Sequence, residues 1–273
     1  MAIRGTFVLD SLQSMGPLAI SLVCTLFTWG ITALGAAVVL FFKKVRPLFL
    51  NLMLGFGAGV MIAASFWSLL APAIEICAGM GEVPWLTPCL GLLLGGAFIL
   101  LADRILDVIG PTEGARFGAD RKRNTLLLIA VTLHNIPEGM VIGVAFASAA
   151  LTLSGTSFYG GLVLAIGIGL QNFPEGAAVS LPLRRDGMSR ARSFFYGQLS
   201  GAVEPLGAMA GVLAVSVMRG MVPFLMAFSA GAMIAVVIGE LIPESVRGSK
   251  TVTIIGFILG FILMMILDVA LTG

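Results

Sequence analysis

Long runs of hydrophobic residues alternate along this chain with short segments that hold most of its charged residues. Each run, as an α-helix, is long enough to cross the ~30 Å hydrocarbon core of a bilayer. We predict helices because lipid cannot pair with free backbone groups and the runs are too long for barrel strands. The eight predicted transmembrane helices span residues 17–42, 49–75, 86–108, 125–149, 159–183, 193–217, 222–243 and 251–272.

Composition agrees with this class, since 58% of the 273 residues are hydrophobic and only 11% are charged. Soluble domains are nearer a quarter charged. The expected fold is therefore an all-α integral membrane protein with one transmembrane domain over residues 1–273 and a short cytoplasmic loop at 109–124. The first run is too long for the core of a signal peptide, so we expect it to remain as a helix.

The sixteen Lys and Arg residues are unevenly distributed between the predicted helices. Most follow the first, third, fifth or seventh helix, whereas Arg4 and Arg219 lie on the other side. The positive-inside rule places the crowded side in the cytoplasm and both termini outside, in a cell membrane. This regular alternation argues against basic patches for nucleic acid. The crowded set is Lys43, Lys44, Arg46, Arg116, Arg121, Lys122, Arg123, Arg184, Arg185, Arg190, Arg192, Arg247 and Lys250.

Similar segments recur in helices that this topology orients in opposite directions. "AGVMIA" from Ala58 in the second helix resembles "AGAMIA" from Ala230 in the seventh, and "NIPEG" and "NFPEG" mark the fourth and fifth helices. The order predicts three helices, a central pair and three inverted helices, an arrangement that recurs in secondary transporters. A third matched set, in the third and eighth helices, is Gly91, Gly95 and Asp103 with Gly256, Gly260 and Asp268.

Three acidic residues, Glu138, Glu175 and Glu204, fall near the centres of predicted membrane helices, where no Lys or Arg lies at the same depth. An ionised group costs about 2–3 kcal/mol at that depth even on insertion scales. A bound cation is the simplest compensation. Intramembrane acids are functional by default, so we interpret these three as a site.

Helical spacing groups further ligand types around these acids. His134 and Asn135 precede Glu138 by four and three residues, and Gln171 and Asn172 stand in the same relation to Glu175, so each set shares a helix face. Imidazole, carboxylate and amide oxygen, with the thioether of Met61 on the second helix, suit a first-row divalent ion such as Zn²⁺ better than Mg²⁺ or Ca²⁺. A lone His or Met in such helices is otherwise an ordinary packing residue.

The motifs "HNIPEG", "QNFPEGAAVSLPLR", "GQLSGAVEPLGA" and "ELIPE" together resemble the ZIP family of divalent metal transporters, in particular its GufA-like branch. The resemblance implies eight helices in a 3+2+3 arrangement. It also implies import of a divalent metal, foremost Zn²⁺ and alternatively Cd²⁺, Fe²⁺ or Mn²⁺, into the cytoplasm, and a homodimer in the lipid bilayer. No catalytic cofactor is implied, and the metal is the cargo.

The resemblance also assigns residues to two adjoining metal positions. The first comprises Met61, His134, Glu138, Gln171 and Glu175, and the second comprises Asn135, Glu138, Asn172, Glu175 and Glu204. The transport path would include Ala64, Ser68, Asp103, Glu240 and Asp268. Some family members carry Asp where this chain has Asn172, so its second position has less negative charge, and the 109–124 segment lacks the histidines found in many relatives.

Two other functions remain open from the residues. An intramembrane metalloenzyme would need a His-Glu-x-x-His motif, but the chain has one His. In a non-transporting membrane receptor, the acids would only pair with polar groups. Cys77 and Cys89 flank one outer loop, and the sequence allows either a disulfide between them or two free thiols.

Overall fold

The computed structural model describes residues 11–41, 47–109, 116–153, 155–185, 187–217, 219–246 and 248–272. For some helical residues, His134 among them, it describes the backbone alone. The regular structure is helical, with π-helical segments η1 and η4 and 3₁₀ turns η2 and η3. In order, the elements are α2 (Pro17–Phe41), α3 (Pro47–Ala64), η1 (Ser65–Leu70), α4 (Ala71–Gly79), α5 (Leu86–Ile109), α6 (Arg116–Ala150), α7 (Phe158–Arg185), α8 (Arg190–Leu199), η2 (Ser200–Val203), α9 (Glu204–Val217), η3 (Arg219–Met221), α10 (Val222–Val236), η4 (Val237–Leu241), α11 (Ile242–Val246) and α12 (Lys250–Thr272).

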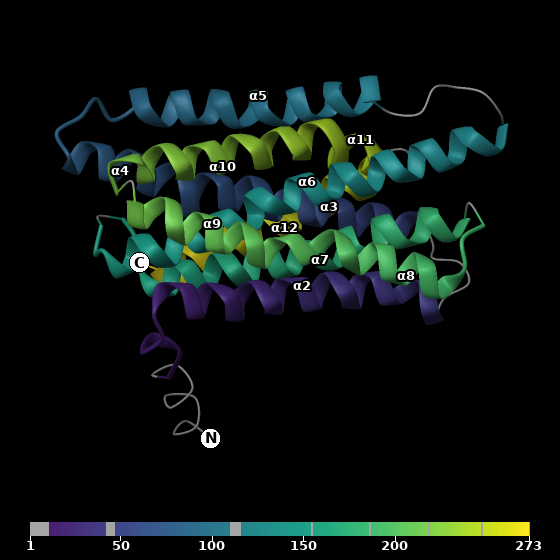
Figure 1. Ribbon diagram of the computed structural model, residues 1–273, viewed down its shortest axis with the longest axis horizontal. Helices are drawn as coiled ribbons and strands as arrows, with labels where there is room; N and C mark the ends of the chain where they lie inside the picture. The colour runs from purple at the N-terminus through teal and green to yellow at the C-terminus, as the bar shows by residue number, and fades with distance from the viewer. Residues whose placement is uncertain are drawn as a thin grey trace.

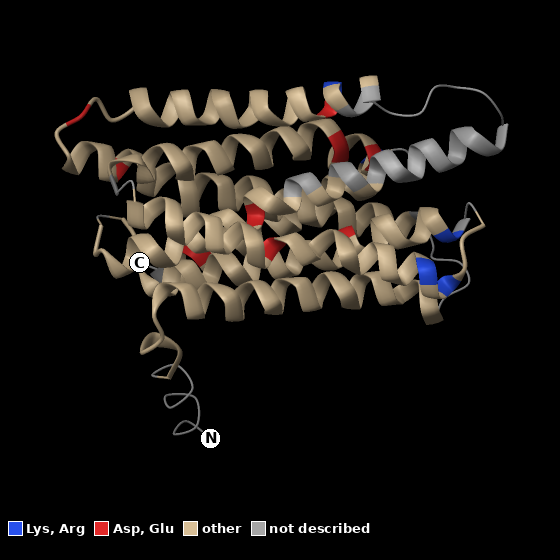
Figure 2. Ribbon diagram, viewed as in Figure 1, with Lys and Arg blue, Asp and Glu red and all other residues tan. Residues whose placement is uncertain are grey.

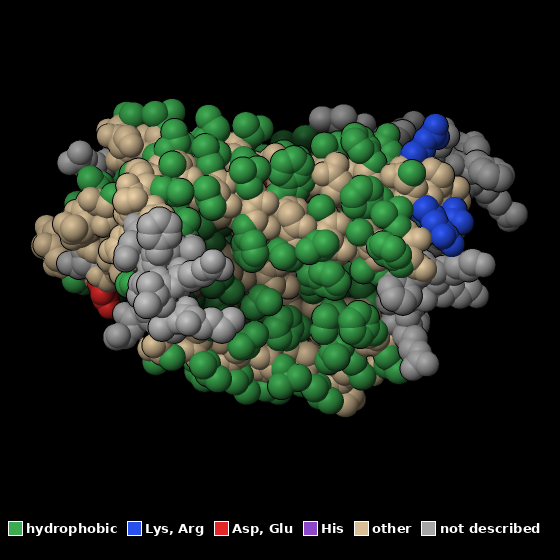
Figure 3. Space-filling model, turned by 90° about the horizontal axis from the view of Figure 1, so that it is seen from below, with side chains coloured by type: hydrophobic (Ala, Val, Ile, Leu, Met, Phe, Trp, Pro, Cys, Tyr) green, Lys and Arg blue, Asp and Glu red, His purple; other side chains and the backbone are tan. Residues whose placement is uncertain are grey.

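The long helices lie side by side in one bundle, in which α2 begins and α12 ends at the same end (Figure 1). In the described part of the chain, seven helical segments are long and apolar enough to cross a membrane. Their outer surface is dominated by hydrophobic side chains (Figure 3), and Leu93 and Leu213 are about two-thirds exposed. The protein is therefore an all-helical, multi-pass membrane protein, as the sequence predicts.

The apolar core runs through the middle of the bundle, where Met61, Ile142, Leu164 and Met233 are almost fully buried. These residues come from α3, α6, α7 and α10, so the helices that carry the repeated motifs are also the central ones. The three cysteines are free thiols, of which Cys89 is exposed while Cys24 and Cys77 are buried.

The structure differs from the expected loop at 109–124 in its second part. Residues 110–115 lie outside the described set, and α6 begins at Arg116 and continues without interruption to Ala150. The residues from Arg116 onward are mainly good helix formers and include no proline before Pro137, so nothing in the sequence stops the helix at the membrane boundary.

Close backbone contacts join the helices in pairs. At several glycines an added methyl carbon would overlap a carbonyl oxygen of the partner helix: Gly59 and Gly260 between α3 and α12, Gly95 and Gly231 between α5 and α10, Gly35 and Gly176 between α2 and α7, and Gly139 and Gly207 between α6 and α9. Small residues allow this approach between membrane helices. The pairs α3–α12 and α5–α10 carry the sequence segments that recur in the inverted repeat. The close contacts therefore occur at equivalent positions of the two pairs.

Local departures from α-helical geometry also occur at matching places. The π-helical segment η1 follows "AGVMIA", and η4 follows "AGAMIA" after the same short interval. By contrast, α6 and α7 continue through Pro137 and Pro174. π-Helical turns are rare and are frequently found at functional sites. They hold Ser68 and Glu240, two residues that the family resemblance places on the transport path.

Candidate metal centre

Helices α6 and α7 bring the two Pro-Glu motifs together in the interior of the bundle. Glu138 is fully buried and Glu175 is 4% exposed. The amide nitrogen of Gln171 donates to Glu138 Oε1 at 2.6 Å and to Asn172 Oδ1 at 2.7 Å. The side chains of the two motifs therefore form one hydrogen-bonded group that bridges the helices.

Glu204 joins this group from a third helix. The 3₁₀ turn η2 ends just before it, and Glu204 begins α9 with its side chain fully buried. Asn172 Nδ2 donates to Glu204 Oε1 at 2.9 Å and to the backbone carbonyl of Thr28 at 3.3 Å. The hydroxyl of Thr28 donates to Glu204 Oε2, so α2 also supports the site.

The centre is strongly acidic for its depth. Glu175 lies within electrostatic range of Glu138, Glu204 and Glu240. Among the described acidic residues, Glu138, Glu175 and Glu204 are buried inside the bundle, whereas the described Lys and Arg side chains gather near the end opposite the termini (Figure 2). A divalent cation would offset the repulsion among these carboxyl groups.

Several oxygen atoms at the centre are available to a cation. Among the side chains that the structure describes, Glu138 Oε2, Gln171 Oε1 and Asn135 Oδ1 are buried and accept no hydrogen bond. Asn135 Nδ2 donates to the carbonyl of Ser200 at 2.9 Å, and this bond fixes the orientation of its amide. Buried acceptors are normally paired, and a bound ion is one explanation for three open ones on neighbouring side chains.

The described residues contain no group of three or more His, Cys, Asp or Glu arranged to hold a metal ion. The side chain of His134 lies outside the described set, although its position on α6 is one helical turn before Glu138. The donors that the structure does bring together are thus carboxylate and amide oxygens.

The remaining predicted residues lie along the same bundle. Met61 and Ala64 are buried on α3. Gly57 lies one turn before Met61 and approaches Gln171, since a Cβ at Gly57 would be 3.5 Å from Gln171 Cβ. This places Met61 on the face of α3 that is turned toward α7.

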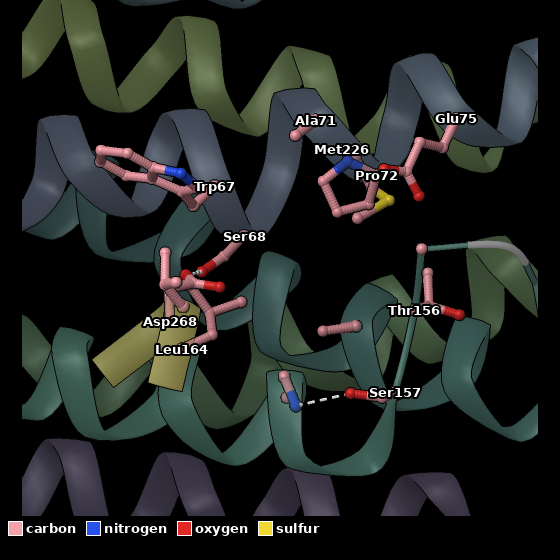
Figure 4. A pocket seen from close by; sticks show the side chains of 15 residues that line it. Trp67, Ser68, Ala71, Pro72, Glu75, Thr156, Ser157, Leu164, Met226 and Asp268 are labelled. Atoms are coloured by element: carbon pink, nitrogen blue, oxygen red, sulfur yellow. Dashed lines mark hydrogen bonds between the residues drawn. The ribbon is translucent and has the colours of Figure 1, made fainter. Parts of the chain in front are cut away.

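The path residues fall into two pairs. The hydroxyl of Ser68 in η1 donates to Asp268 of α12, and Glu240 in η4 lies within electrostatic range of Asp103 on α5. Ser68 and Asp268 line a cavity of about 380 Å³ at the end of the bundle where α12 ends (Figure 4). Glu75 and Thr156 line the same cavity.

Thr28 is the functional neighbour that the sequence reasoning missed. Its signal was present, because Ser21, Thr25, Thr28 and Thr32 recur at helical spacing along an otherwise apolar α2, and all four are buried. Such a stripe of hydroxyl groups marks the face of a membrane helix that contacts other protein groups.

Comparison with known proteins shows the family to which the chain belongs. The family model "ZIP Zinc transporter" matches residues 110–268. The chain is 37% identical to "Zinc transporter ZIP11" of Bos taurus, over 95% of this chain and 99% of the relative. It is 41% identical to "Zinc transporter ZIPB" of Bordetella bronchiseptica, over 88% of this chain and 77% of the relative, and 36% identical to "Zinc transporter GufA" of Myxococcus xanthus, over 92% and 98%. The chain therefore belongs to the ZIP family of zinc transporters, which are transport proteins and not enzymes.

Proposed function

We propose that this protein imports Zn²⁺ into the cytoplasm through a metal position between α6 and α7. The observation that carries the proposal is the buried group of Glu138, Gln171 and Asn135, each with an open acceptor oxygen. Glu175 faces the same centre. His134 and Met61 complete the first metal position by their place on α6 and α3.

The proposed architecture has eight membrane-spanning helices, with α6 as the eighth, in a 3+2+3 inverted repeat. Its support is the matching set of contacts. Gly139 of α6 packs against the backbone at Glu204, and Gly176 of α7 packs against the backbone at Thr32. The two motif helices thus make equivalent contacts with α9 and α2.

We further propose that both termini are extracytoplasmic in the cell membrane and that the protein is a homodimer. The gathering of the described Lys and Arg at the opposite end supports this orientation. In this orientation, the cavity beside Ser68 and Asp268 is on the outer side and Asp103 and Glu240 lie toward the cytoplasm.

Uptake into sealed vesicles containing the purified protein tests the function. Saturable Zn²⁺ entry, with Cd²⁺, Fe²⁺, Mn²⁺ and Mg²⁺ as competitors, is expected, and Mg²⁺ should compete poorly because it prefers an all-oxygen octahedral shell. Zn²⁺ entry no faster than in protein-free vesicles would contradict transport and leave the receptor interpretation. The metalloenzyme interpretation has no support beyond the acids themselves.

A further inference from the structure

We infer that the centre binds one zinc ion per protomer, because the amide group of Asn172 occupies the place beside Glu204 that a second ion would need. The inference rests on the proposed function, since it concerns the number of ions at the same centre. It changes the role of Glu204 from metal ligand to positioning residue.

The orientation of the Asn172 amide is fixed by its surroundings. A backbone carbonyl can only accept hydrogen bonds, so the contact of 3.3 Å with the carbonyl of Thr28 must come from the amide nitrogen. The same nitrogen donates to Glu204 at 2.9 Å. An amide NH₂ group has no lone pair for a metal, so the side of Asn172 that faces Glu204 cannot be a ligand.

The other end of the amide is also occupied. Asn172 Oδ1 accepts from Gln171 Nε2 at 2.7 Å, and this nitrogen in turn donates to Glu138 Oε1 at 2.6 Å. Gln171 consequently turns its own carbonyl oxygen away from Asn172, and that oxygen is one of the open acceptors. The hydrogen bonds thus direct the available oxygens toward the first position.

The carboxyl group of Glu204 is hydrogen-bonded through both oxygens and tightly packed by its neighbours. Its two oxygens accept from Asn172 and from the hydroxyl of Thr28. A Cβ added at Gly201 would lie 3.0 Å from Glu204 Oε1 and 2.9 Å from Thr32 Oγ1, so the turn η2 and α2 close tightly over the carboxyl group. A metal ion would have to displace these contacts.

The equivalent residue on α6 shows the contrast. Asn135 also donates through its amide nitrogen to a backbone carbonyl, that of Ser200, but its oxygen has no hydrogen-bond partner among the described residues. The two asparagines occupy matching places in the repeated motif. One offers an oxygen to a cation, and the other has both ends of its amide hydrogen-bonded.

The test is the amount of zinc bound by the purified full-length protein in lipid nanodiscs, measured by equilibrium dialysis and elemental analysis. Wild type and Glu204→Gln are both expected to bind one Zn²⁺ per protomer. Asn172→Asp should bind two, because its new carboxylate would face Glu204 and the carbonyl of Thr28 and would need a cation between them. Two ions in wild type, a loss of zinc in Glu204→Gln, or one ion in Asn172→Asp would overturn the inference.

Two further variants distinguish a residue that positions the ligands from a residue that binds the metal. Glu204→Ala should weaken zinc affinity about 10-fold to 100-fold at unchanged stoichiometry, as loss of a residue that orients ligands does, whereas Glu204→Gln keeps an acceptor for Asn172 and should lose less affinity, because only the charge is removed. The visible spectrum of bound Co²⁺ should be the same in wild type and Glu204→Gln, and an altered spectrum would mean that Glu204 is a ligand. Glu138→Gln should bind no zinc, and full zinc binding by that variant would contradict the proposed function itself.

Discussion

Glu138 and Glu175 are equivalent residues of a repeated motif, yet they reach the centre from two different helices. Each is close enough to the other acids that removal of either changes the charge available to a metal ion. Around them, single hydrogen bonds decide which buried oxygen atoms remain without a hydrogen bond. In the proposed site, those open oxygen atoms are the ones available to a metal ion.

We expect Glu138→Ala and Glu175→Ala to reduce Zn²⁺ uptake to the level of protein-free vesicles, because each removes a carboxylate from the metal position. Folding should persist, as judged by an unchanged gel-filtration profile. Uptake near the wild-type rate by either folded variant would show that the metal passes elsewhere.

Zinc binding should weaken as the pH falls from about 7 to about 5, because imidazole and carboxylate ligands bind metal only after they lose a proton. Equilibrium binding is the appropriate measurement, since a proton gradient can also act on flux. His134→Gln is the control, and it should have a shallower pH dependence than wild type. Equal pH dependence in both proteins would exclude His134 as a ligand.

The Thr28 hydroxyl should stabilise the protein through its hydrogen bond to Glu204. Thr28→Val keeps the shape and leaves a buried carboxyl oxygen without this donor, which costs about 1–3 kcal/mol. Thr28→Ser keeps the hydroxyl and is the matched control. Thermal unfolding in detergent should show a lower midpoint for Thr28→Val than for Thr28→Ser. Equal midpoints would mean that the hydrogen bond contributes nothing to the stability of the folded protein.

At the scale of helices, the contacts depend on glycine at specific positions. Gly95 and Gly96 are neighbours on α5, but a methyl group at Gly95 would overlap the backbone at Phe228, whereas one at Gly96 would lie 3.8 Å from the nearest atom, the carbonyl oxygen of Gly231. Backbone atoms cannot move aside as a flexible side chain can. The two positions therefore offer a direct comparison within one helix.

Gly95→Ala should destabilise the protein by about 1–3 kcal/mol or more, as overpacking does. Gly96→Ala should be neutral or stabilising, since alanine favours the helix by about 1 kcal/mol over glycine. Thermal unfolding of the two variants in one detergent provides the measurement. No loss of stability in Gly95→Ala would indicate that α5 and α10 are not in close contact at Gly95.

Sequence patterns predicted some elements and missed others for identifiable reasons. The all-helical membrane class followed from apolar runs that admit no other structure in lipid. The start of α6 at Arg116 was missed because polar helix residues beyond the membrane give no hydrophobic signal. The bond from Thr28 to Glu204 was missed because it depends on the rotation of α2 about its axis, which spacing within α9 cannot define.

At the scale of the whole molecule, charge and polarity define two ends. The Lys and Arg side chains that the structure describes gather at one end, and α2 begins and α12 ends at the other (Figures 1 and 2). Cys89 is exposed near the start of α5, whereas Cys24 and Cys77 are buried. A single accessible thiol can therefore report the orientation of the protein.

In intact cells, a membrane-impermeant maleimide should label wild-type protein at Cys89 and should not label Cys89→Ser, because the proposed topology places the start of α5 outside. Labelling that needs cell rupture would reverse the proposed orientation. Labelling of Cys89→Ser in intact cells would show that a second thiol is accessible.

The glycine contacts also restrict how the bundle can move. Helices whose backbones touch have no layer of flexible side chains between them, so α3 with α12, and α5 with α10, should each behave as a stiff unit. A rearrangement that exposes the centre to one side of the membrane and then the other must then slide such units past their neighbours. A disulfide engineered within the α3–α12 pair should accordingly leave zinc uptake intact, whereas one that ties α6 to α10 should stop it until a reductant is added.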